Sequence, residues 1–148
     1  MWDEIRFRYP HGRMIIYMDT FFPATAANIR KLYRSMEQSY DTDVDQLVDL
    51  ILEHFDKRSV RIEKDIRKAA NDFAESKTAY EEKKAQYSAG KKANGVPIRK
   101  EERRAWKGDI QKLNEHWRGN KRHYDQLMSE QKKLSQNRLL LLTLNGRC

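Results

Sequence analysis

The sequence predicts a mainly α-helical α+β fold, in which a long antiparallel coiled-coil helical hairpin projects from a compact head with a small N-terminal β-hairpin. Two sets of large side chains recur at heptad spacing, the pattern that packs helices along a seam. Between them, near residues 88–97, lies a loop with two glycines and a final proline, which interrupt helices. The first set is Ile66, Phe73, Tyr80 and Tyr87; the second is Trp106, Leu113, Asn120, Leu127, Leu134 and Leu141.

The first residues of the chain predict the β-hairpin. In residues 4–9, apolar and charged side chains alternate, as they do in a half-buried strand. Pro10–Arg13 supplies turn residues, and Met14–Met18 is the expected returning strand.

Two helices follow in the predicted head. In the first, expected after residues 21–25, apolar residues recur at helical spacing: Ile29, Leu32, Tyr33, Met36 and Tyr40. The second begins near Asp41 or Thr42, either of which can cap its free amide groups. Its apolar coverage is broad up to Phe55 and then narrows to the seam, which places the base of the hairpin there.

The end of the chain returns to the head. Leu139–Leu144 is a short apolar run that fits either a last helical turn or a third strand, and Asn145–Gly146 marks its end. The predicted domains are therefore a head of residues 1–56 and 134–148, and a hairpin of residues 57–133.

The register of the hairpin follows from facing large residues with small ones. For a loop centred near residue 93, the best match pairs positions whose numbers add up to 186. Along the seam this register sets Tyr80 against Trp106, Phe73 against Leu113 and Ile66 against Asn120. In the layer between, it sets a small residue against a large one, with Ser76 facing Ile110 and Ala69 facing Trp117.

Positive charge is concentrated around the predicted loop. Residues 1–56 carry six basic and ten acidic side chains, whereas residues 57–148 carry 24 and 12. Such a surface attracts phosphate groups through counterion release. The residues expected to contact nucleic acid or another partner are Lys91, Lys92, Arg99, Lys100, Arg103, Arg104, Lys107, Lys112, Arg118, Lys121 and Arg122.

A plainer interpretation of these charges stays open. Charged flanks of coiled coils are commonly solvated and joined by salt bridges, as Glu81 with Lys84 or Glu101 with Arg104 could be. Gly108 and Gly119, inside the return helix, indicate either close approach of a partner or simple tolerance in a long helix.

Catalytic and metal-binding motifs are missing from the sequence. It contains no P-loop, nucleophile elbow, HExxH or paired-cysteine spacing, so we expect no enzyme activity, cofactor or metal. Cys148 is the only cysteine, which indicates a reducing, cytoplasmic location. No signal peptide is expected, because the first residues lack the basic and apolar regions of one. No membrane-spanning segment is expected either, because the apolar run Leu139–Leu144 is far too short to cross a bilayer.

The head, over roughly 40 residues that begin Met1-Trp-Asp-Glu-Ile-Arg-Phe-Arg-Tyr-Pro-His-Gly12, resembles small accessory proteins of bacterial mobile elements. The resemblance implies a protein that acts on host machinery, and inhibitors of Cas nucleases (anti-CRISPR proteins) are one such group. Those inhibitors share no common fold, so no residue roles are transferred.

Two functions remain open from the sequence. In the first, the basic hairpin engages RNA, DNA or a nucleoprotein complex such as a Cas nuclease, and blocks or organises it. In the second, the hairpin is a protein–protein scaffold or oligomerisation module whose charges only confer solubility. The sequence leaves a monomer and a homodimer equally open.

Overall fold

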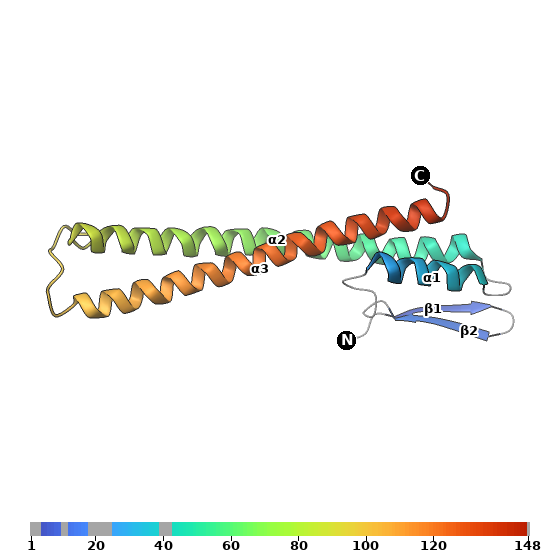
Figure 1. The fold of residues 1–148 in the computed structure, drawn as a ribbon, viewed down its shortest axis with the longest axis horizontal. Coiled ribbons are helices and arrows are strands. Elements are labelled where there is room, and N and C mark those ends of the chain that lie inside the picture. The colour runs from blue at the N-terminus through green and yellow to red at the C-terminus, as the bar shows by residue number, and fades with distance from the viewer. Residues whose placement is uncertain (1–3, 10–11, 18–24, 39–42, 148) are drawn as a thin grey trace. The chain divides into compact units, whose positions relative to one another are not determined.

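A computed structural model describes residues 4–9, 12–17, 25–38 and 43–147 of the chain. Most of these residues are helical, as the sequence predicts. Figure 1 shows the elements in chain order: β1 (Glu4–Tyr9), β2 (Gly12–Tyr17), α1 (Ala26–Gln38), α2 (Val44–Ala89) and α3 (Arg103–Leu144). The chain divides into a first unit, residues 1–63 and 128–148, and a second unit, residues 64–127.

The two strands form an antiparallel pair in the first unit. Their register places Ile5 opposite Ile16 and Phe7 opposite Met14. The centre of the expected turn, Pro10 and His11, lies outside the described residues.

Side-chain caps fix where the first two helices begin. The Thr25 hydroxyl accepts a hydrogen bond of 3.2 Å from the Asn28 amide at the start of α1. The Asp43 carboxylate accepts one of 3.1 Å from the Gln46 amide at the start of α2. The predicted caps, Asp41 and Thr42, lie outside the described residues, and the capping bond belongs to Asp43 because α2 starts at Val44.

Removing the Asp43 cap should weaken α2. We expect Asp43→Ala to lower the free energy of unfolding by about 1 kcal/mol, because one amide at the helix start loses its acceptor. Asp43→Asn is the matched control, since asparagine caps about as well. Urea unfolding followed by circular dichroism measures both, and equal losses in the two variants would contradict the capping role.

The core of the first unit joins all three helices. From α1 come Ile29, Leu32 and Met36, which are buried as the helical spacing predicts. The side chains that α2 and α3 bury are Leu47, Val48, Ile51, Leu52, Phe55, Leu134 and Leu141. Leu139–Leu144 belongs to α3, so the helical alternative for this run is confirmed and the strand is wrong.

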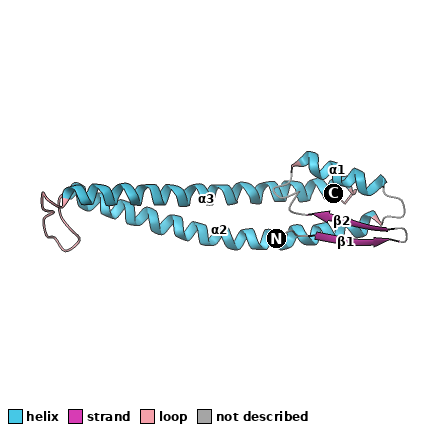
Figure 2. Ribbon diagram, turned by 90° about the horizontal axis from the view of Figure 1, so that it is seen from below, coloured by secondary structure: helices cyan, strands magenta, loops and turns pink. Residues whose placement is uncertain are grey.

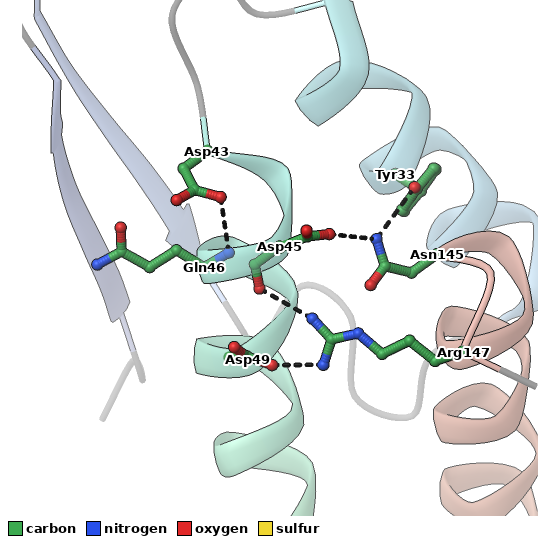
Figure 3. A network of polar contacts seen from close by, with 7 residues as sticks. All are labelled: Tyr33, Asp43, Asp45, Gln46, Asp49, Asn145 and Arg147. Carbon is green, nitrogen blue, oxygen red and sulfur yellow. Dashed lines mark hydrogen bonds and ion pairs between the residues drawn. The ribbon is translucent and has the colours of Figure 1, made fainter.

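A polar network ties the end of α3 to the start of α2 (Figure 3). The Asn145 amide donates to the Asp45 carboxylate at 3.0 Å and to the Tyr33 hydroxyl at 3.3 Å. The Arg147 guanidinium pairs with Asp49 and donates to the Asp45 carbonyl at 3.2 Å. Its hydrogen bond to Asp49, with the charge of that carboxylate adding to it, raises the pKa of Arg147.

In the second unit, α2 and α3 lie side by side and antiparallel (Figures 1 and 2). The rings of Phe73 and Trp117 lie 6.1 Å apart, as do those of Tyr80 and Trp117. Phe73 also stacks with Tyr124 at 6.2 Å. The predicted seam residues therefore do meet, but in a different register.

The register with a sum of 186 is wrong by about one heptad. Phe73 contacts Trp117 and Tyr124, which bracket Asn120, so facing positions add up to about 193. Asn120 accordingly faces Ser76 rather than Ile66, donating to the Ser76 hydroxyl at 3.1 Å and to the Asp72 carbonyl at 3.2 Å. Ser76 is buried, so this pair forms a satisfied polar layer inside the seam.

The loop explains this shift. It runs over residues 90–102 instead of closing at Pro97, so α3 begins later than predicted. Gly90, at φ +71°, ends α2, and its carbonyl accepts a hydrogen bond of 2.8 Å from the amide of Ile98, a buried residue. A bridge between Lys91 and Pro97 closes the loop on itself. The extra residues before Arg103 slide the return helix along its partner.

Candidate nucleic-acid interface

Six cations of α3 share one side of the helix. At about 100° per residue, all of them fall within an arc of about 100°. The seam residues of the same helix, such as Trp106 and Tyr124, lie outside this arc. We call this surface the α3 basic face; it comprises Arg103, Arg104, Lys107, Arg118, Lys121 and Arg122, all exposed.

The α3 basic face is long and straight because it follows one helix. From Arg104 to Arg122 the rise of about 1.5 Å per residue gives a span of about 27 Å. Gln111 and Asn114 occupy the face between its two clusters of charge. The arrangement therefore presents two groups of cations in a row.

Four cations of this face are free to bind something else. Within residues 64–127, all of which the structure describes, Arg104, Lys107, Lys121 and Arg122 form no ion pair and lie over no ring. The plainer interpretation named Glu81 with Lys84 and Glu101 with Arg104 as possible ion pairs, and neither forms among these residues. Glu81 pairs with Lys77 at 3.9 Å, and it is Glu102, not Glu101, that pairs with a cation, Lys92.

Aromatic rings hold the remaining two. The guanidinium of Arg103 lies 5.8 Å from the centre of the Tyr87 ring, and that of Arg118 lies 6.0 Å from the Trp117 ring. Such contacts contribute about 0.5–1 kcal/mol at exposed sites. Both guanidinium groups remain exposed, so they can also face a phosphate.

The loop contributes a second group of predicted site residues. Lys91, Arg99 and Lys100 are exposed. Lys92 is half-buried, and its ammonium pairs with Glu102 at 2.9 Å. This ion pair links the two sides of the loop, so Lys92 has a structural role that the sequence did not indicate.

Lys112 is separated from the others. It is exposed on α3, but about 140° around the helix from Lys107. The structure also adds cations that the prediction omitted, Lys64, Arg67 and Lys68, which are exposed on α2 in the second unit. The short run of charges in residues 64–68 is the sequence signal that marks these three cations.

Net charge distinguishes the two units. The second unit has 17 basic and 10 acidic residues, a balance of +7. The rest of the chain has 13 and 12, a balance of +1, so nearly all of the formal net charge of +8 belongs to residues 64–127.

Gly108 and Gly119 leave open space beside α3. A Cβ atom built on either would meet no atom of the described chain within 4 Å. Both lie about 90° or more from the centre of the α3 basic face. They are therefore not needed for packing, and they do not open that face to a partner.

Replacing these two glycines should stabilise the chain. We expect Gly108→Ala and Gly119→Ala each to raise the free energy of unfolding by about 1 kcal/mol, because alanine restricts the unfolded chain and favours helix. Gly90→Ala is the contrasting control: its φ of +71° disfavours any side chain, so that variant should lose stability. Urea unfolding measures all three. A loss of stability at 108 or 119 would reveal a close approach that the structure does not contain.

Other kinds of site find little support in the described residues. No group of three or more histidine, cysteine, aspartate or glutamate side chains in them could hold a metal ion. None of the described helices is both long enough and apolar enough to cross a membrane.

Comparisons with known protein families, with curated proteins and with solved structures find no match to this chain.

Proposed function

We propose that the chain is a non-enzymatic nucleic-acid-binding protein whose second unit contacts the phosphate backbone. The observation that carries the proposal is the α3 basic face, where four of six cations have no partner among the residues that the structure describes. A single exposed cation needs no partner, because water solvates it. A row of cations on one side of one helix, however, is the pattern that phosphates neutralise.

Binding at this face would gain its free energy from counterion release. Each phosphate contact adds about 0.9 to the slope of log affinity against log salt on duplex DNA. Exposed, flexible lysine and arginine side chains suit such contacts because they follow the backbone without reading bases. The loop cations Arg99 and Lys100 would extend the same surface past the start of α3.

The test of this function is a binding titration of the full chain with labelled nucleic acid at several salt concentrations. The proposal expects a linear dependence on log salt whose slope corresponds to several phosphate contacts. Affinity that does not change between about 50 and 200 mM salt would rule out a phosphate-based interface.

A nucleoprotein target is the narrower form of the proposal. Inhibition of a Cas nuclease rests on the resemblance of the head, over roughly the first 40 residues, to accessory proteins of mobile elements. The acidic side chains of α2 give little support to a contact with such a target, because they are engaged within the first unit. Asp45 bonds to Asn145, Asp49 pairs with Arg147, and Asp56 pairs with Arg138. Capture of partners from a bacterial lysate, with and without nuclease treatment, distinguishes a nucleic-acid target from a protein one.

A second candidate function is protein–protein assembly. It is favoured by three exposed apolar side chains in the first unit, Val60, Met128 and Leu139, whose exposed fractions are 67%, 42% and 57%. Analytical ultracentrifugation separates the candidates. A dimer that persists at high salt and ignores nucleic acid would favour assembly, whereas a monomer that binds nucleic acid would favour the basic face.

A further inference from the structure

Building on the proposed function, we infer that the α3 basic face takes double-stranded nucleic acid through its phosphates, in preference to single strands. Proteins that bind single strands combine a basic groove with aromatic rings on which bases stack, and each stacked base contributes about 1–3 kcal/mol. Binding of a single strand would therefore require an aromatic ring in the second unit that is free to stack on a base beside these cations.

The rings of the second unit are already engaged. Residues 64–127 contain six phenylalanine, tyrosine and tryptophan side chains, all described and all only partly exposed. Three of them, Phe73, Trp117 and Tyr124, pack against one another in the seam.

The chain's own cations cover the rest. The ammonium of Lys83 lies 3.7 Å from the centre of the Trp106 ring, and that of Lys84 lies 5.7 Å from the Tyr80 ring. Arg103 lies over Tyr87. A base could stack on these rings only by displacing a contact worth about 0.5–1 kcal/mol, so the gain from stacking is reduced.

Histidine rings can also stack on bases, and the second unit has two. His116 and His123 are exposed on α3. Both lie roughly 150° around the helix from the centre of the α3 basic face. A strand held by the cations of that face would therefore not reach them.

A duplex suits the α3 basic face better than a single strand because its phosphate charges are more densely spaced. Its charges are spaced at about 1.7 Å along the axis, against about 3.4 Å for one strand, and each contact adds about 0.9 rather than about 0.7 to the salt slope. Six contacts would then favour duplex over single strand by about tenfold at 0.1 M salt. A straight helix about 27 Å long matches a stiff duplex better than a flexible strand.

The experiment compares the full chain on a DNA duplex of about 20 base pairs, an RNA duplex of the same sequence and each single strand, at 0.1 M salt. Fluorescence is recorded in a Trp2→Phe background, so that Trp106 and Trp117 are the only tryptophans. We expect either or both duplexes to bind about tenfold more tightly than the single strands, without quenching of tryptophan fluorescence.

Equal or tighter binding of single strands would overturn the inference while the proposed function stands, and quenching would then identify Trp106 or Trp117 as a stacking platform. Absence of binding to every probe would remove the proposed function, and this inference with it. A duplex preference that differs between RNA and DNA supports the inference and assigns the duplex type.

Discussion

Reversing the four unpartnered charges of the α3 basic face should abolish most of its affinity for nucleic acid. In the variant Arg104→Glu, Lys107→Glu, Lys121→Glu and Arg122→Glu, four phosphate contacts are lost. The salt slope on duplex DNA should fall by about 3.6, and affinity at 0.1 M salt should fall by about 10³-fold. These residues are exposed and make no ion pair within the described chain, so the fold should be unaffected.

A second variant controls for net charge. Arg30→Glu, Lys31→Glu, Arg34→Glu and Arg61→Glu change four exposed cations of the first unit that are not on α3, and both variants take the formal net charge from +8 to 0. If the face itself binds, the control keeps most of its slope, since long-range attraction between exposed charges is screened beyond about 10 Å at 0.1 M salt. Equal losses in the two variants would mean that overall charge, not this surface, governs binding.

The helices of this chain could be predicted because their signals are periodic and long. Four positions at heptad spacing before the loop and six after it are hard to explain by any other structure, and α2 and α3 follow them. The same periodicity could not fix the register. If one helix slides by a heptad along the other, seam residues again lie opposite seam residues. The length of the loop decides the register. The heptad pattern does not indicate that Ile98, within this loop, is buried.

Local choices among similar residues were also beyond the sequence. Asp41, Thr42 and Asp43 can all cap a helix, so only the position of the first turn assigns the bond to Asp43. The run Leu139–Leu144 has no clear period of its own. It is helical because Leu141 is buried in the core of the first unit while Leu139 stays exposed, which is a helical alternation set by its surroundings.

The candidate site was predicted in composition more than in arrangement. Helical spacing places Arg104, Lys107 and Lys121 on one side once α3 is known to be continuous. The roles of Lys92 and Arg103 depend on which groups the loop and the seam bring near them, Glu102 and the Tyr87 ring, and these follow from tertiary packing. Charge counts therefore locate the candidate interface, and packing decides which of its cations have no partner among the described residues.

Truncating Phe55 should give the largest loss of stability of any single change considered. Its side chain is only 1% exposed and lies in the core of the first unit with Ile51 and Met36. Phe55→Ala leaves a cavity that a packed core cannot close, and we expect the free energy of unfolding to fall by about 3–5 kcal/mol. Far-UV circular dichroism in urea measures this loss.

The matched control is Val60→Ala, one and a half turns further along α2, where the side chain is 67% exposed. It should change stability by less than about 0.5 kcal/mol, because no core contact is removed. Phe55→Leu tests the mechanism itself: it keeps most of the buried volume and should recover much of the loss. If Phe55→Ala costs no more than Val60→Ala, α2 is not anchored in the first unit by this side chain; if Phe55→Leu is as damaging as Phe55→Ala, ring shape rather than buried volume holds it there.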